Sequence, residues 1–248
     1  MVSFVVLFVH CLLFISRPAC EHCSGMGNDV LQGDSMITTR EIAFHLPGLD
    51  LSLEIVANVE DLVTDPEDDD QIPYWAELWP AARGLAQYIW ERIDFQGATV
   101  LELGAGLGLP GLVAALKGGL VTFSDYIEES LDIIARNARR NGIQAASYLL
   151  ADWRDFQCDK KFDWIIGSDV LYNPTLNPYV AGILERNLSV RGQLLFSHPS
   201  RPVTMQFIDD IKRSLGLQEE KAVQVVTVQE PGVPQFNQGI DIHHLTKI

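Results

Sequence analysis

Two periods govern the hydrophobic pattern of this chain. Near the start of the patterned part, residues 41–46 and 51–56 alternate apolar and polar positions and flank Pro47-Gly48, which predicts a β-hairpin. An acidic segment with one proline follows at 65–70 and is expected to be a solvated loop. Apolar residues at every third or fourth position then predict a helix over 82–93.

From residue 98 onward, predicted strands alternate with predicted helices. Strands are expected at 98–103, 121–124, 147–150, 162–167 and 193–197, and helices after Gly108 and at 127–140, 176–188 and 202–215. Two late β-rich segments, 221–228 and 240–246, have no helix between them. This order predicts an α/β fold with a doubly wound, mostly parallel seven-stranded sheet. An antiparallel pair is expected at its C-terminal edge, with the small hairpin at the N-terminus.

The N-terminal residues form an apolar run with three interpretations. Residues 1–15 are compatible with a secretory signal, a membrane anchor, or an upstream extension outside the working protein, with Met26 and Met36 as later starts. We therefore leave residues 1–36 out of the fold, and expect a chain beginning at Met36 to fold and keep its cofactor. Residues 37–73 then carry the hairpin and acidic loop, and 74–248 the catalytic domain. The expected location is the cytoplasm, unless the apolar run is a genuine signal or anchor.

Composition narrows the class of protein. The chain has 248 residues, of which 47% are hydrophobic, enough for one large domain with a substantial core. Its 18 basic and 33 acidic residues give a net charge of -15, which disfavours general binding to nucleic acids. Four cysteines are too few for a disulfide framework. We expect a monomer.

Ligands of a doubly wound sheet bind beyond the carboxyl ends of its strands. The first such loop carries Gly104, Gly106 and Gly108, preceded by Glu102. Counted from the strand end, a dinucleotide-binding pattern would need a glycine where Leu109 stands. A carboxylate so close to the loop suits a cationic cofactor, such as a sulfonium, better than a pyrophosphate.

The next two loops offer groups for a nucleoside. Asp125 ends the second strand, 21 residues after Gly104, where a carboxylate can accept both ribose hydroxyls or cap the following helix. Tyr126 adjoins it. Asp152 can accept from an adenine amino group, and Trp153 can cover the ring or simply pack on the sheet edge.

The fourth loop is expected to bind the substrate. Asp169 could hold an amine and Tyr172 could orient it, although a helix cap and a packed tyrosine would use the same residues. His198, after the fifth strand, is either a base facing this cleft or a locally satisfied histidine. His243 and His244 should point to opposite faces of a strand, so they predict no shared metal.

Together the loops resemble the class I, seven-β-strand S-adenosylmethionine-dependent methyltransferases, from Tyr74 to the C-terminus. Residues 102–108, Glu-Leu-Gly-Ala-Gly-Leu-Gly, look like motif I of that family, and Asp125 like its ribose-binding acid. Asp152 and Trp153 are similar to its adenine-contacting pair. The resemblance implies a Rossmann-like fold with S-adenosylmethionine as the cofactor.

Two further motifs resemble the methyltransferase 16 group of protein-lysine methyltransferases and their bacterial relatives. They are Trp-Ala-Glu-Leu-Trp-Pro at 75–80, followed by Gly-Leu-Ala-Gln-Tyr at 84–88, and D-x-x-Y at 169–172. The resemblance implies that Trp79 lies beside the cofactor and that Asp169 and Tyr172 border the target nitrogen. Methyltransferases that act on planar amides or adenine usually carry N-P-P-aromatic after the fourth strand, and this chain does not.

We therefore expect methyl transfer to a nitrogen of a protein lysine, without a metal or covalent intermediate. A small-molecule amine is the alternative substrate. Two other classes stay open: a methyltransferase-like binding module without activity, and a nicotinamide-dependent oxidoreductase. The oxidoreductase lacks support, because the chain has no Tyr-x-x-x-Lys motif.

Overall fold

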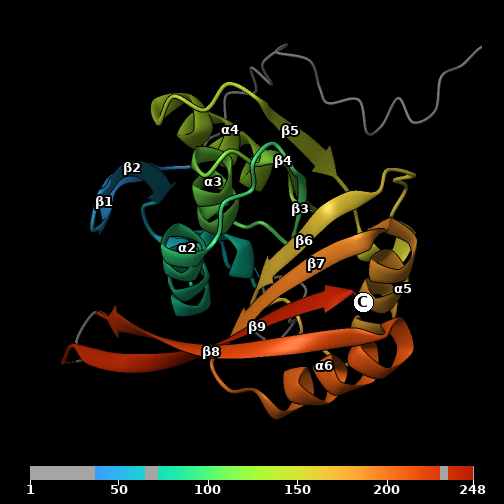
Figure 1. Cartoon of the computed structure of the whole chain (residues 1–248). Helices are drawn as coiled ribbons and strands as arrows, with labels where there is room; N and C mark the ends of the chain where they lie inside the picture. Colours follow the sequence, from blue (N-terminus) through green and yellow to red (C-terminus); the bar gives the residue numbers. More distant parts are fainter. Residues whose placement is uncertain (1–36, 65–71, 230–233, 248) are drawn as a thin grey trace, which may run out of the picture.

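The computed structural model describes residues 37–64, 72–229 and 234–247 (Figure 1). The apolar N-terminal segment and the acidic segment 65–70 lie outside the described residues.

One mixed sheet forms the centre of the molecule. Its strands are β3 (Thr99–Leu103), β4 (Leu120–Asp125), β5 (Ala146–Leu150), β6 (Phe162–Ser168), β7 (Leu188–His198), β8 (Leu217–Val228) and β9 (Phe236–Lys247). Within the described residues the strand order is β5-β4-β3-β6-β7-β9-β8. All pairs from β5 to β7 are parallel, whereas β9 runs antiparallel to both β7 and β8. The predicted doubly wound fold, with its antiparallel edge pair, is confirmed.

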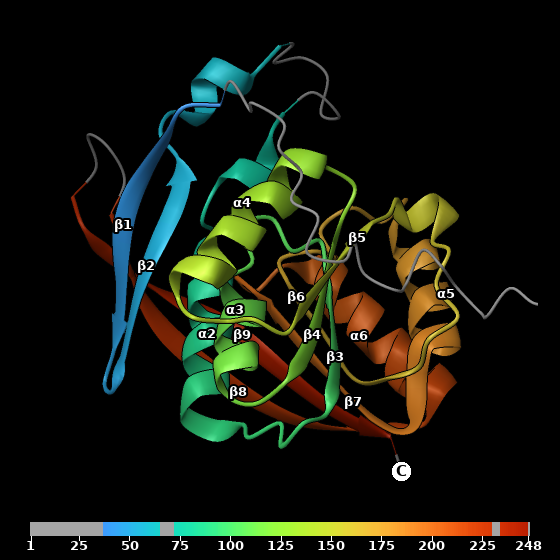
Figure 2. The ribbon, with the colours of Figure 1, turned by 90° about the horizontal axis from the view of Figure 1, so that it is seen from above.

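Helices cover both faces of the sheet (Figures 1 and 2). They are α2 (Pro80–Arg92), α3 (Leu109–Leu116), α4 (Glu128–Arg140), α5 (Asn177–Asn187) and α6 (Pro202–Leu215). The inward residues of β3 show the division, because Val100 packs in the core beneath α2, α3 and α4 while Leu101 and Leu103 pack beneath α5 and α6. Short 3-10 turns occur at η1 (Val59–Leu62), η3 (Tyr74–Ala76) and η4 (Trp153–Asp155).

The predicted hairpin forms from β1 (Thr39–Leu46) and β2 (Leu49–Val56) and docks on α4. The side-chain amide of Asn137 accepts from the Glu54 N–H (2.7 Å) and donates to the Glu54 carbonyl (2.8 Å). Asn141 pairs in the same way with the backbone of Ser52, at 3.1 and 2.8 Å. Two side-chain amides thus satisfy an edge of β2 that would otherwise need another strand.

Three strands extend beyond their predicted bounds. β7 begins at Leu188 rather than 193, β8 at Leu217 rather than 221, and β9 at Phe236 rather than 240. β8 gains three polar residues after the buried Leu217, and β7 gains Arg191 and Gly192, all of which weaken a strand pattern. Hydrogen bonds to the neighbouring strands therefore extend these strands through residues whose own sequence does not predict a strand.

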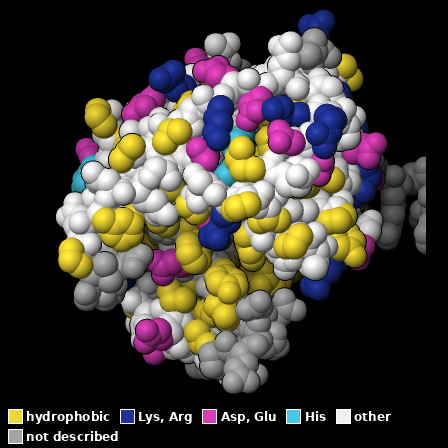
Figure 3. All heavy atoms as spheres, turned by 90° about the horizontal axis from the view of Figure 1, so that it is seen from below, with side chains coloured by type: hydrophobic (Ala, Val, Ile, Leu, Met, Phe, Trp, Pro, Cys, Tyr) yellow, Lys and Arg dark blue, Asp and Glu magenta, His cyan; other side chains and the backbone are white. Residues whose placement is uncertain are grey.

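The surface carries no extended region of one charge on the face seen from below. Basic and acidic side chains are mixed over the upper part of this view, and apolar side chains gather across its middle and lower part (Figure 3). Among the described residues, no helix is both long and apolar enough to cross a membrane.

Two helical glycines provide a test of the packing around the glycine loop. A β-carbon at Gly111 in α3 would collide with Glu102 Oε2 and with the Phe123 ring, whereas one at Gly182 in α5 would meet only the flexible end of Arg186. We expect Gly111→Ala to lower the free energy of unfolding by about 1–3 kcal/mol through overpacking. Gly182→Ala should raise it by up to about 1 kcal/mol, the helix-propensity gain. Urea unfolding of both variants measures this, and equal effects would contradict the packing.

Candidate functional site

The loop between β3 and α3 contains three glycines with a positive φ, and two of them show why glycine is needed there. Gly104 and Gly108 adopt φ values of +55° and +73°, which disfavour other residues. A β-carbon at Gly104 would lie 2.9 Å from Val170 Cγ1 and 3.0 Å from Trp153 Cζ2, and one at Gly108 would lie 2.8 Å from Ile134 Cγ1. The loop backbone therefore lies directly against side chains from the neighbouring loops.

Asp125 joins the end of β4 to this loop. Its Oδ2 accepts from the Gly106 N–H (2.9 Å) and its Oδ1 from the Ile127 N–H (3.1 Å), at the start of α4. The residue is only 4% exposed. Burial raises the pKa of its carboxyl, and the backbone N–H groups oppose that rise. Asp125 thus supports the helix start, and its role toward a ribose stays a prediction.

Glu102 lies in the core beneath the first turn of α3. Its Oε2 accepts from the Gly111 N–H at 3.2 Å, so a carboxyl group stands at the N-terminus of the helix. Its Oε1 is buried and has no hydrogen-bond partner among the described residues. Burial raises the pKa of Glu102 well above its usual value. An unpartnered carboxyl oxygen on the strand that leads into the glycine loop fits a cofactor that brings a positive charge or a donor.

The segment before α2 reaches the same loop. A β-carbon at Gly106 would lie 3.1 Å from the carbonyl oxygen of Trp75. Trp79, directly before α2, donates from Nε1 to the Tyr74 carbonyl at 2.8 Å. The Tyr74 ring lies 6.2 Å from that of Trp79 and 6.0 Å from that of Tyr172. Tyr74, which sequence reasoning did not select, thus links the predicted cofactor side to the predicted substrate side.

The two residues predicted to contact adenine, Asp152 and Trp153, have different surroundings. Trp153 lies against Gly104, as described above, while the Asp152 carboxylate is engaged by Arg154, with 2.6 Å between Arg154 Nη2 and Asp152 Oδ2. Asp152 also accepts from the Arg154 N–H at 2.8 Å and caps the η4 turn. The hydrogen bonds from Arg154 lower its pKa. Tyr126 is 56% exposed, next to Asp125.

On the substrate side, Asp169 forms a two-pronged ion pair with Arg201. Arg201 Nε donates to Asp169 Oδ1 (2.7 Å) and Nη2 to Oδ2 (2.9 Å). Asp169 has a φ of +51°, and its N–H donates to the Ser197 carbonyl at 2.7 Å. Tyr172, three residues on, is 43% exposed. No sequence pattern indicated Arg201, which lies 32 residues from its partner.

His198 is not a base that faces the cleft, because both of its ring nitrogens are hydrogen-bonded to other groups inside the protein. It ends β7 and is fully buried. Nδ1 accepts from the Arg201 N–H (2.9 Å), and Nε2 lies 2.8 Å from Nε2 of His243. Nδ1 of His243 lies 2.5 Å from Oε1 of Glu219.

The direction of this chain of hydrogen bonds follows from its first donor. Because His198 Nδ1 accepts, the neutral ring carries its proton on Nε2 and donates to His243. His243 then carries its proton on Nδ1 and donates to Glu219. His244 lies on the other face, near Tyr88 and Gln193, as the strand alternation predicted.

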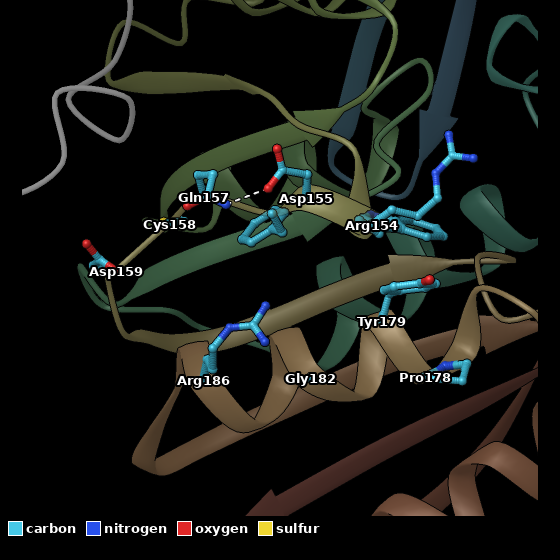
Figure 4. Close-up of a pocket in the computed structure, with 11 residues that line it drawn as sticks. Arg154, Asp155, Gln157, Cys158, Asp159, Pro178, Tyr179, Gly182 and Arg186 are labelled. Carbon is cyan, nitrogen blue, oxygen red and sulfur yellow. Dashed lines mark hydrogen bonds between the residues drawn. The ribbon is translucent and has the colours of Figure 1, made fainter.

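A pocket of about 600 Å³ lies between residues 153–159 and α5 (Figure 4). Arg154, Tyr179 and Arg186 are among its lining residues. Of the predicted site residues only Trp153 lines this pocket, and Trp153 also lies against Gly104 of the glycine loop. The described residues contain no group of three or more His, Cys, Asp or Glu side chains that could hold a metal ion.

The contacts of Asp125 lead to a prediction about the cofactor. Asp125→Asn keeps the shape of the side chain but replaces one carboxylate oxygen with an NH2 donor, so either the Gly106 or the Ile127 N–H loses its acceptor. The substitution also removes the negative charge that a ribose would meet. We expect the affinity for S-adenosylmethionine to fall by about 1–3 kcal/mol, roughly five- to 150-fold, in titration calorimetry.

Asp163→Asn is the matched control for this variant. The Asp163 carboxylate also accepts a backbone N–H, that of Thr99 at 3.0 Å, but near the start of β6, away from the strand ends that carry the loop. It should leave the affinity unchanged. An equal loss in both variants would contradict a role for Asp125 in the cofactor site.

We expect the free energy of unfolding to decrease at acidic pH because of His198. Burial and the neighbouring His243 lower its pKa to about 4 from 6.5, with Lys221 acting in the same direction and Asp241 and Asp169 against it. Between these values the unfolded chain binds a proton that the folded chain does not. This contribution to stability, of the order of 3 kcal/mol, is complete above pH 6.5 and is lost as the pH falls toward 4.

His198→Asn tests this coupling, because Asn keeps an acceptor for the Arg201 N–H. In urea unfolding at pH 7, 6 and 5, the difference in stability between the wild type and the variant should shrink as the pH falls. A difference that is independent of pH would contradict it.

Relatives and solved structures resemble this chain over its central part. A histidine protein methyltransferase 1 homolog from Dictyostelium discoideum is 36% identical over 124 residues, which are 47% of this chain and 40% of that protein. Histone-arginine methyltransferase METTL23 from Rattus norvegicus is 37% identical over 110 residues, 42% of this chain and 49% of that protein. The chain thus spans less than half the length of these two relatives.

The fold has solved counterparts. The 16S rRNA N2 G1207 methyltransferase RsmC from T. thermophilus, solved with AdoMet and guanosine, aligns with a TM-score of 0.58 at 16% identity. The alignment covers 85% of this chain and 51% of that one, and supports the fold alone.

The family model described as lysine methyltransferase matches residues 66–214. That range contains the glycine loop, Asp125, Trp153 and the Asp169–Tyr172 turn, and it confirms the resemblance on which S-adenosylmethionine was expected as the cofactor. The chain belongs to the lysine methyltransferase family, whose cofactor is S-adenosylmethionine.

Proposed function

We propose that this chain transfers a methyl group from S-adenosylmethionine to a protein side-chain nitrogen, with lysine as the acceptor. One observation carries the proposal: the Asp169–Tyr172 turn lies against the glycine loop. Val170, between the two substrate-side residues, would be 2.9 Å from a β-carbon at Gly104. The strands that carry the two loops, β3 and β6, are hydrogen-bonded neighbours.

The residues of the chain divide the work of such a reaction. The glycine loop, Asp125 and Trp153 would hold the cofactor, with Glu102 beneath the loop. The cofactor supplies an electrophilic methyl group on a sulfonium. Tyr74, Trp79 and Tyr172 would exclude water from the side where the acceptor enters, and positioning supplies most of the rate.

A lysine acceptor must reach the methyl group as an uncharged amine. Loss of water around the ammonium lowers its pKa and favours the neutral form. The described residues that meet at this side are apolar, aromatic or paired with each other, so they do not replace the lost hydration of an ammonium.

The acceptor type is decided by this chain's own residues, because its relatives differ. The family description names lysine, whereas the relatives above are named for histidine and for arginine. A small-molecule amine is the competing substrate class. We propose a cytoplasmic monomer, and the buried, unpaired Cys158 is compatible with a reducing compartment.

Labelling separates the two substrate classes. The purified chain is incubated with radiolabelled S-adenosylmethionine and a cell extract, and proteins are then separated from small molecules. Label on a protein band, absent with Asp169→Asn, supports the proposal. Label confined to the small-molecule fraction overturns the protein acceptor, and no label in either fraction overturns methyl transfer.

Replacing Asp169 should affect turnover more than cofactor binding. Asp169→Asn removes the charge and unpairs Arg201 without touching the glycine loop. We expect kcat to fall about 100-fold, the size typical of losing one preorganised polar group, with the affinity for S-adenosylmethionine within about twofold of the wild type. Tyr172→Phe, which removes only the hydroxyl, should have a smaller effect in the same direction.

Asp210→Asn is the matched control for this measurement. Asp210 forms an ion pair with Arg213 on the exposed side of α6 and belongs to none of the loops. Its kcat should equal that of the wild type. A parallel loss of cofactor affinity in Asp169→Asn would contradict an acceptor-side role.

A further inference from the structure

The carboxylate expected to receive the acceptor is already occupied. Arg201 presents Nε and Nη2 to the two oxygens of Asp169 at 2.7 and 2.9 Å, the fork geometry in which a guanidinium binds a carboxylate. The Asp169 side chain is 8% exposed and that of Arg201 is 40% exposed. From solvent, the guanidinium is therefore the more accessible member of the pair.

Both members of the pair are held by the end of one strand. Asp169 donates its N–H to the Ser197 carbonyl, and Arg201 donates its N–H to His198 Nδ1. The Arg201 carbonyl in turn accepts from Met205 in the first turn of α6, at 3.1 Å. His198 is itself fixed by His243, and His243 by Glu219. The backbone on each side of the ion pair thus has a defined position before any substrate arrives.

The hydrogen bond from Arg201 to Asp169 also raises the pKa of the guanidinium, to which Tyr172 adds a further favourable interaction. Arg201 stays charged at any physiological pH. It occupies the carboxylate in the same mode that the guanidinium of a substrate arginine would use. An ammonium would have to compete for the same two oxygens.

We propose that Arg201 is a specificity-determining residue of the acceptor site, which excludes guanidinium side chains and admits the acceptor nitrogen in its uncharged form. A lysine amine can lose its proton and enter beside the neutral Asp169–Arg201 pair. An arginine remains protonated and finds its binding partner taken. This inference rests on the proposed function, since it names the acceptor chemistry of the same site.

Binding of small probes tests the proposal without requiring methyl transfer. The probe is N-acetyl-arginine methylamide, added to the full chain with S-adenosylhomocysteine at pH 7 and followed by NMR titration. Arg201→Gln frees Asp169 and should bind the probe at least tenfold more tightly than the wild type. Arg201→Gln combined with Asp169→Asn should lose that gain, because the freed carboxylate is gone.

Two further variants keep the test decisive. Arg213→Gln removes an arginine from an ion pair on the exposed side of α6 and should bind the probe as the wild type does. Arg201→Met supplies an uncharged, unbranched side chain as long as that of Gln, and it replaces Arg201→Gln if the latter unfolds at a lower temperature. Equal affinity of the wild type and the Arg201 variants, including no binding by either, overturns the proposal.

The binding test for Arg201 can fail or succeed independently of the labelling test for methyl transfer. A gain of guanidinium binding in Arg201→Gln supports the exclusion of cations even if no protein becomes labelled. Labelled lysine in a protein, together with wild-type affinity for the probe equal to that of Arg201→Gln, overturns the role of Arg201 and leaves methyl transfer standing.

Discussion

Two buried carboxyl groups hold a loop that has almost no side chains of its own. Asp125 receives N–H groups from the glycine loop and from the start of α4, and Glu102 receives one from the first turn of α3. Burying a carboxyl group is costly unless backbone donors satisfy it, so these contacts fix where the loop can lie. The backbone held in this way lies directly against Trp75, Trp153 and Val170.

The proposed acceptor side depends on a different structural element, the end of β7. Ser197 and His198 are consecutive, and each receives the N–H of one member of the Asp169–Arg201 pair. β9 then brings His243 beside His198, and β8 brings Glu219 to His243. The antiparallel edge strands therefore do more than widen the sheet, because they support the turn that carries Arg201.

The features that could be predicted from the sequence are those that depend on hydrophobic periodicity and on the local spacing of residues. Alternation identified the hairpin around Pro47-Gly48, and the position of Asp125 after a strand identified a residue that does contact the glycine loop. Periodicity reports which face of an element is buried, but not which polar groups meet there. The docking of Asn137 on Glu54, 83 residues apart, and the pair of Asp169 and Arg201 were therefore not predictable. Of the two interpretations of His198, the structure agrees with the satisfied histidine, but the partner His243, 45 residues away, was not predictable.

Charge acts on this chain at two separate ranges. The net charge of -15 attracts positively charged groups over distances that salt limits to about 8 Å beyond the surface. At the proposed acceptor site the local charge is different, because Arg201 neutralises the one carboxylate that follows β6. An acceptor lysine would thus be drawn in as a cation and would react as a neutral amine. In the proposed reaction, the free energy of approach and the free energy of deprotonation would be governed by different groups, so attraction of a lysine cation would not stabilise the unreactive ammonium at the proposed acceptor site.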